Sequence, residues 1–391
     1  MFYNGLCLGW RLFQPLDLNT MLYSFLFFNL IKLNYMKHKF PYEWTLKDAK
    51  FTKDKGKVFS CFACGGGSTM GYKLAGFDVI GCNEIDPKMM EAYRTNHNPK
   101  HSFLEPIQTF KERKDLPKEL YNLDILDGSP PCSSFSMAGN REKDWGKDKK
   151  FREGQQKQVL DTLFFDFIDL AEELKPKIVV AENVKGLLLG SAKSYVREIY
   201  KQFDSAGYYV QHWLLNAAKM GVPQRRERVF FIALRKDLSG PYMEQKSLFD
   251  VLPKLDLFFN EKEIVFKTIM DHNAIKNTLN ETYTNLMSEL KEGEPDLRYP
   301  TKRLTGKENN FGNKIQYKNK VCYSILASDK DIIYKENRYK TKIEFLKAGT
   351  YPVDYNFGPT KPAYLIGMSV PPVMVAQIVT KIYEQWRGIF H

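Results

Sequence analysis

The fold is decided by one stretch near the N-terminus, KVFSCFACGGGSTMG, residues 57–71. Its apolar first half predicts a strand, and the glycines that follow predict a tight loop that opens a short helix. A second apolar run, residues 77–83, ends at Glu84, about twenty residues beyond the loop, where dinucleotide-binding folds place a ribose-binding acid. Together these features predict a doubly wound, mostly parallel α/β sheet. We expect the glycines to let the backbone approach a ligand, and a purely structural turn is the alternative.

A cysteine follows two prolines in the run LDILDGSPPCSSFS, residues 123–136. The prolines fix two φ angles, so the backbone before the Cys132 thiol is stiff. A nucleophile must be aimed, and a rigid loop after a strand suits that requirement. A packed, unreactive cysteine is the alternative, and this run alone does not decide between the two.

Two further motifs place polar groups beside strands. The run KIVVAENV, residues 177–184, brings Glu182 and Asn183 to the end of an apolar strand, where open α/β sheets bind ligands. A desolvated carboxyl there can stay protonated and donate a proton. The run GVPQRRER, residues 221–228, puts three arginines before an apolar strand, which favours an anion or carboxylate partner. A solvated strand end and a solvated charge run are the alternatives.

The order of four motifs carries a resemblance: FACGGG at 62–67, PPC at 130–132, ENV at 182–184 and QRRER at 224–228. The chain resembles the DNA cytosine carbon-5 methyltransferases of bacterial or phage modification type. RYKTKIE at 338–344 and LIGMSVPP at 365–372 are similar to the family's last two motifs. The resemblance implies a Rossmann-like S-adenosylmethionine-dependent methyltransferase fold with a smaller inserted target recognition domain. It implies S-adenosylmethionine as cofactor and double-stranded DNA as partner.

The resemblance also assigns residues. The catalytic residues it implies are Cys132, Glu182, Arg226 and Arg228. The implied cofactor-binding residues are Phe62, Ala63, Cys64, Gly65, Gly66, Gly67, Glu84, Ile85, Ser129, Pro130, Ser369 and Val370. The implied substrate-binding residues are Pro131, Ser136, Asn183 and Gln224, and no metal is implied.

In the implied reaction, Cys132 adds to carbon 6 of cytosine and activates carbon 5 for methylation. Glu182 contacts the ring nitrogen at position 3 and the exocyclic amine, and Arg228 contacts the carbonyl oxygen. Arg226 holds either Glu182 or a phosphate. The base has to leave the stack to reach such a site.

Four positions depart from the family's pattern. Cys64 and Met368 stand where the family usually has Gly and Asn, and Ile343 stands where it has Arg. Pro106 replaces the Asp expected at the adenine, so the adenine contact is open, with Glu105 as the substitute.

Composition fits a nucleic-acid-binding protein. The formal net charge is +12, which suits DNA phosphates but equally RNA or acidic membranes. The six cysteines show no disulfide pattern, which favours a reduced cytoplasm, and the lone pair Cys61 and Cys64 is a poor zinc motif. The apolar run at 21–31 is too short to span a bilayer, so we expect no membrane association. We expect a monomer, and the resemblance leaves room for a cognate restriction endonuclease that acts separately.

The chain divides into four predicted parts. Residues 1–35 are a dispensable arm or an artefact of the assigned start, with translation beginning at Met36. Residues 36–235 form the catalytic and cofactor-binding domain, 236–335 the target recognition domain, and 336–391 a return segment. Apolar residues spaced by three and four predict a core helix over 160–174, ended by Pro176, and a closing helix after Pro372.

Three other functions stay open from sequence. An RNA (tRNA) cytosine carbon-5 methyltransferase on the same scaffold would share every motif. A nicotinamide-dependent oxidoreductase would explain the glycine loop and Glu84 but leaves Cys132, Glu182 and the arginines without a use. A non-catalytic DNA-binding module would explain the charge but needs no thiol after a proline pair.

Overall fold

The computed structural model describes residues 38–131, 148–149, 158–159, 162–190, 192–245, 251–310 and 312–391. Two predicted site residues, Cys132 and Ser136, lie outside the described residues. The predicted arm at 1–35 and the predicted start at Met36 also lie outside them.

A seven-stranded sheet forms the centre, in the order β3-β2-β1-β4-β7-β9-β8. Its strands are β1 Lys57–Cys61, β2 Asp78–Glu84, β3 His101–Leu104, β4 Ile125–Gly128, β7 Ile178–Val184, β8 Tyr208–Asn216 and β9 Glu227–Arg235. The first five strands of that order are parallel, whereas β9 runs antiparallel to both β7 and β8. A short β5–β6 pair, Asp148–Lys149 with Gln158–Val159, stands apart from this sheet.

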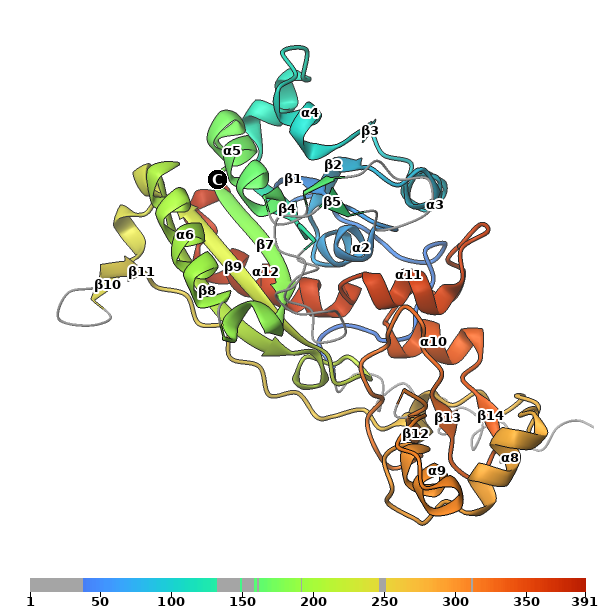
Figure 1. The fold of residues 1–391 in the computed structure, drawn as a ribbon. Coiled ribbons are helices and arrows are strands. Elements are labelled where there is room, and N and C mark those ends of the chain that lie inside the picture. The colour runs from blue at the N-terminus through green and yellow to red at the C-terminus, as the bar shows by residue number, and fades with distance from the viewer. Residues whose placement is uncertain are drawn as a thin grey trace, which may run out of the picture. The chain divides into compact units, whose positions relative to one another are not determined.

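Alternate residues of the central strands supply two separate cores, as expected for a sheet covered on both faces. Phe59, Leu126 and Val179 pack with α4 (Ile107–Lys111), α5 (Leu163–Leu174) and α6 (Ala192–Ser205). Val58, Ile125 and Val180 pack on the other face with α2 (Gly67–Leu74) and α12 (Pro372–Gln385). Figure 1 shows α5 and α6 on one side of the sheet and α12, in red, behind β7 and β9. A further helix, α3 (Pro87–His97), follows β2 and bonds to α2 through Tyr93 OH and Thr69 Oγ1 at 2.8 Å.

These elements confirm the predicted fold class, a doubly wound, mostly parallel sheet. The predicted core helix is α5, which ends at Leu174, two residues before Pro176. The closing helix is α12, and it packs against α2, where an added Cβ at Gly71 would lie 2.4–3.0 Å from atoms of α12. The stretch Pro362–Gln385 is long and apolar enough to cross a membrane by composition, but 83% of its most apolar window is buried inside the protein. That burial is typical of a core helix.

A smaller lobe lies between β9 and α12 in the chain. After the hairpin β10 (Met243–Gln245) and β11 (Val251–Pro253) it contains these elements: α7 Phe266–Ile269, α8 Glu281–Ser288, α9 Arg298–Thr305, β12 Ile315–Gln316, β13 Ile332–Ile333 and β14 Arg338–Tyr339. Its own small core joins Leu286 and Leu297 to Ile315 and Ile332. The segment that follows β11 packs on the sheet instead, through Leu255 and Leu257. The predicted boundaries at 236 and 335 remain predictions.

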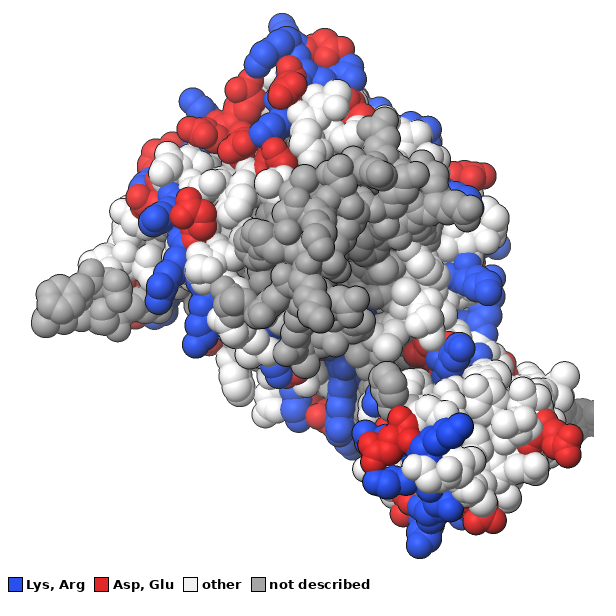
Figure 2. All heavy atoms as spheres, in the orientation of Figure 1, with Lys and Arg blue, Asp and Glu red and all other residues white. Residues whose placement is uncertain are grey.

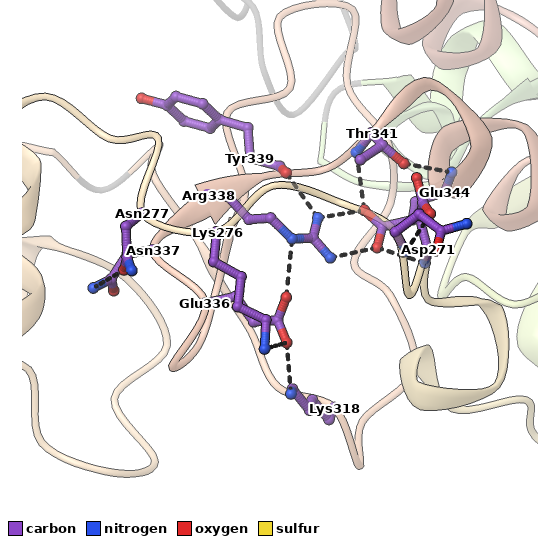
Figure 3. A network of polar contacts seen from close by, with 11 residues as sticks. Asp271, Lys276, Asn277, Lys318, Glu336, Asn337, Arg338, Tyr339, Thr341 and Glu344 are labelled. Atoms are coloured by element: carbon purple, nitrogen blue, oxygen red, sulfur yellow. Dashed lines mark hydrogen bonds and ion pairs between the residues drawn. The ribbon is translucent and has the colours of Figure 1, made fainter.

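A buried cluster of charged side chains joins the segment that enters this lobe to the segment that leaves it (Figure 3). The Arg338 guanidinium donates to both carboxylate oxygens of Glu344, at 2.8 and 2.7 Å, and to Glu336 at 3.0 Å. Glu344 lies on α10 (Lys342–Ala348) and also accepts the Asp271 N–H from the incoming segment. The exposed fraction of each of the three charged side chains is 4% or less, so Arg338 pairs with two buried carboxylates, of which Glu336 also has Lys318 at 2.7 Å.

Candidate functional site

The register of the sheet places the ends of four neighbouring strands level with one another, in one row, and a predicted motif follows each of them. Cys61 pairs with Asn83 on β2 and with Gly128 on β4, and Gly128 pairs with Ala181 on β7. The residue after each member of the row starts a predicted functional segment, and these residues are Glu84, Phe62, Ser129 and Glu182. Four adjacent strands spaced about 4.8 Å apart give a span of about 14 Å from Glu84 to Glu182. The carboxyl ends of these parallel strands therefore form one continuous edge.

In the loop after β1, every second residue from Phe62 to Gly66 has a positive φ angle. Phe62, Cys64 and Gly66 have φ values of 52°, 50° and 83°, so two non-glycine residues adopt the left-handed conformation. Such residues are uncommon, and they concentrate where function holds the backbone. A glycine would adopt the conformation of Cys64 without strain.

The three glycines serve protein packing, and the predicted approach of a ligand to their backbone stays a prediction. An added Cβ would lie 2.7 Å from the Leu365 side chain at Gly65 and 2.5 Å from the Val370 carbonyl at Gly67. At Gly66 it would collide with the His97 ring. The glycines thus let α3 and the segment before α12 press against the loop from the protein side.

Glu84 is bound by backbone on three sides. Its carboxylate accepts the N–H groups of Cys64, Ile85 and Asp86 at 2.7, 2.8 and 2.9 Å. Burial raises the pKa of Glu84, and the backbone donors act against that rise. A carboxylate has about four acceptor positions, so a further donor from a ligand can still be accepted. Glu84 therefore fixes the loop to β2 in addition to its predicted contact with a ribose.

Two aromatic side chains that sequence analysis did not assign hold the same loop. The Gly65 carbonyl accepts the Tyr355 hydroxyl at 2.5 Å and the His97 Nε2 at 3.3 Å. Burial lowers the pKa of His97 to about 3, so the ring is neutral at physiological pH. Tyr355 lies 290 residues from Gly65 in the chain, and no local pattern announces such a contact.

The segment before Cys132 is held by the next strand. Asn183 Nδ2 donates to the Pro130 carbonyl at 3.2 Å, and Asn183 Oδ1 accepts the Val184 N–H at 2.8 Å. Because β4 and β7 are parallel neighbours, Pro130 and Pro131 leave the sheet beside Glu182. The described part of the chain thus ends here at Pro131, beside the Glu182 edge, and Cys132 lies outside it.

A buried carboxyl that sequence analysis missed lies below this edge. Asp127 on β4 accepts hydrogen bonds from Ser60 Oγ and Ser68 Oγ, both at 2.7 Å, and from Tyr72 OH at 3.2 Å. Burial raises the pKa of Asp127 to about 6. A charged residue inside an otherwise apolar strand was the signal in the sequence. Ser68 lies in the first turn of α2, the helix that follows the glycine loop. The hydrogen bonds of Asp127 therefore join this helix to β4, the strand that precedes the Pro130–Pro131 segment.

Glu182 is paired with one of the predicted arginines. Arg228 Nε lies 2.8 Å from Glu182 Oε1, and the two side chains are 17% and 13% exposed. The pair forms because β9 runs antiparallel to β7, with Val184 opposite Arg228. A partly buried carboxylate with an arginine beside it is suited to binding a polar, neutral ring edge.

The other two residues predicted from QRRER are turned into the protein. Gln224 donates to the Ala348 carbonyl at 2.9 Å and accepts the Ile325 N–H at 3.1 Å. Arg226 is 2% exposed and donates to backbone carbonyls, and burial lowers its pKa to about 9. Among these bonds Arg226 has none to Glu182, and the predicted contacts of Gln224 with substrate and of Arg226 with a phosphate stay predictions.

The remaining predicted positions lie around the same loop. Ser369 and Val370 are 5% exposed, and the Ser369 Oγ lies 3.7 Å from Cys64 Sγ. Ala63 is buried and its N–H donates to the Asn83 carbonyl at 3.2 Å. Glu105, the proposed substitute for the missing acid, is engaged by Arg113 at 3.0 Å. Within the described ranges, no group of three or more metal-ligating side chains occurs.

Comparison with known proteins identifies the family. The family model for C-5 cytosine-specific DNA methylase matches residues 56–384. The chain is 37% identical over 183 residues to the type II methyltransferase M.FnuDI of Fusobacterium nucleatum, covering 47% of this chain and 48% of that protein. It is 29% identical over 340 residues to M1.HphI of Haemophilus parahaemolyticus, covering 83% of this chain and 85% of that protein. The match thus spans about half the length of the first relative and most of the second.

Solved structures share the fold. A putative DNA modification methyltransferase encoded within an E. coli prophage superposes with a TM-score of 0.58 at 20% identity, over 85% of this chain and 99% of that chain. Spodoptera frugiperda DNMT2 superposes with a TM-score of 0.56 at 17% identity, over 84% and 99% of the two chains. At these identities the likeness supports the fold alone.

Proposed function

Because the chain belongs to the C-5 cytosine-specific DNA methylase family, we propose that it methylates carbon 5 of cytosine in a specific DNA sequence. The observation that supports this most is the shared row of strand ends. It brings the glycine loop, the Pro130–Pro131 segment and the Glu182–Arg228 pair to one edge of the sheet. The proposed cellular setting is a monomer in the cytoplasm, with a restriction endonuclease, where one exists, acting separately.

In the proposed mechanism the Cys132 thiolate adds to carbon 6 of a flipped-out cytosine. Electron density moves to carbon 5, which accepts a methyl group. Loss of the carbon 5 proton and expulsion of the thiolate then restore the ring. Asn183 holds the Pro130 carbonyl and so orients the segment that carries the thiol. Glu182, kept in place by Arg228, accepts a hydrogen bond from the exocyclic amine and, when protonated, donates one to the ring nitrogen at position 3, where charge develops.

The residues present fit S-adenosylmethionine as cofactor, which supplies the methyl group when it is bound. Glu84 retains acceptor capacity for a ribose hydroxyl at the β2 end of the edge. The neighbouring loop has its left-handed backbone fixed by Glu84, Tyr355 and His97, so a site there is organised before binding. The span of about 14 Å along the edge separates the ribose position from the base position.

The charge on the surface supports a nucleic-acid substrate. In the face drawn in Figure 2, Lys and Arg side chains gather on the lower part of the sheet domain, whereas basic and acidic side chains are mixed at the near end of the small lobe. Acidic side chains are more frequent at the upper left of the same view. Cations on one side attract phosphates, which position the duplex without reading its sequence.

The experiment that tests this function is covalent trapping. Purified protein with S-adenosylmethionine is incubated with duplex DNA that carries 5-fluorocytosine in a sequence it methylates. Fluorine cannot leave as a proton does, so wild type should give a denaturation-resistant complex and Cys132→Ser should give none. Methyl transfer to DNA without any trapped complex would contradict the covalent mechanism, and transfer to tRNA alone would favour the RNA enzyme.

A further inference from the structure

One guanidinium joins three parts of the proposed active site. Arg226 lies immediately before β9, two residues from the Arg228 that pairs with Glu182. Its Nη1 donates to the Ile325 carbonyl at 3.1 Å and to Ser324 Oγ at 3.4 Å, on the chain segment between β12 and β13. Its Nη2 donates to the carbonyls of Gly367 and Ser369, both at 2.8 Å.

The two carbonyls bound by Nη2 belong to the segment that presses on the cofactor loop. An added Cβ at Gly67 would lie 2.5 Å from the Val370 carbonyl and 2.9 Å from Ser369 Cβ. The position of residues 367–370 therefore determines how closely the loop and the start of α2 can pack. Arg226 is the side chain that pins this segment to the sheet.

None of the ion pairs among the described residues involves Arg226, and its Nε has no partner there. A cation buried against carbonyls and one hydroxyl, without a carboxylate in direct contact, is costly to keep, and a role in stability is served better by an apolar side chain of similar volume. Its fork geometry, in contrast, reaches two separate segments at once, which a point-like ammonium group cannot do.

We propose that Arg226 is a positioning residue for the cofactor: by fixing residues 367–370 against the glycine loop it sets the affinity for S-adenosylmethionine. This inference rests on the proposed function, and it separates Arg226 from Arg228. Arg228 belongs to the base-binding pair and acts on the chemical step. Arg226 acts through Ser369 and the loop, so its loss should weaken cofactor binding and spare the turnover of bound substrates.

The test compares Arg226→Lys with Arg225→Lys. Both substitutions keep the charge, but Arg225 is 55% exposed and has only Glu263, 3.7 Å away, as an ion-pair partner. Calorimetric titration of the DNA-free protein with S-adenosylmethionine should show a dissociation constant about tenfold higher for Arg226→Lys, equivalent to about 1.4 kcal/mol. The KM for the cofactor should rise by the same factor with kcat at saturation within about twofold, and Arg225→Lys should match wild type.

Unchanged cofactor affinity in Arg226→Lys, or a fall in kcat at constant KM, would overturn the proposal. If Arg226→Lys does not fold, Gly67→Ala tests the same step, since its Cβ displaces residues 369–370 while Arg226 stays. Gly67→Ala should also weaken binding, and wild-type affinity there would equally overturn the inference. Failure of the wild-type protein to bind S-adenosylmethionine would count against the proposed function instead.

Discussion

Replacement of Asp127 by Asn should change how stability depends on pH. Asp127 is fully buried, and burial raises its pKa from 3.8 to about 6, against the opposing effect of three hydroxyl donors. A raised carboxyl pKa means that folding favours the protonated form. The stabilisation is therefore complete below pH 3.8 and is lost as pH rises through about 6. At 1.36 kcal/mol per pKa unit, the loss amounts to about 3 kcal/mol.

The assay is urea unfolding of wild type and Asp127→Asn at several pH values from 4 to 7, followed by tryptophan fluorescence. The free energy of unfolding of the variant minus that of wild type should increase by about 3 kcal/mol across this range, because Asn does not titrate. Asp237→Asn is a control of opposite sign, since Arg235 lowers the pKa of Asp237 and its stabilisation is lost as pH falls. A difference that stays flat for Asp127→Asn would refute the reasoning, because the hydroxyls would then offset burial fully.

Three further substitutions test other contacts. Glu84→Gln should raise the dissociation constant for S-adenosylmethionine at least about tenfold, because a charged acceptor of three N–H groups is lost. The control Glu91→Gln, at an exposed position, should leave this constant unchanged, and equal affinities of Glu84→Gln and wild type would refute the prediction. Asn183→Ala should lower kcat about tenfold without changing DNA affinity, because the Pro130 carbonyl loses its hydrogen-bond donor. An unchanged kcat would contradict this prediction. Arg338→Ala should destabilise the lobe by about 3–5 kcal/mol in urea unfolding, because buried Glu344 loses its cation while Glu336 keeps Lys318; a loss below about 1 kcal/mol, the value expected for exposed Arg298→Ala, would count against this.

The strands and core helices were predictable because their signal is local. Residues 57–61, 78–84 and 178–184 read as apolar runs bounded by glycine, proline or charge, and the structure has strands at these positions. The meeting of their ends was predictable from the rule that parallel strands present their carboxyl ends at one edge. The pairing of Glu182 with an arginine also followed, although the choice of Arg228 over Arg226 did not.

Hydrogen-bond partners that lie far apart in the chain could not be predicted from the sequence. The donors to the Gly65 carbonyl come from Tyr355 and His97, and nothing near residue 65 specifies them. The glycines illustrate the same limit, because their spacing marks a position without room for a Cβ but not whether a ligand or the protein fills that space. In this chain the protein fills it, through Leu365, His97 and Val370.

The QRRER motif shows how one short run serves two purposes. Gln224 and Arg226 precede β9, and their side chains bond to Ile325 and to the segments around Ala348 and Ser369, while the Arg226 carbonyl still accepts the Ala217 N–H at 3.0 Å. Arg228 is already inside β9, opposite Val184, and the antiparallel register fixes it beside Glu182. The boundary of β9 at Glu227 thus lies between Arg226, which bonds to the segment that packs on the glycine loop, and Arg228, which pairs with Glu182.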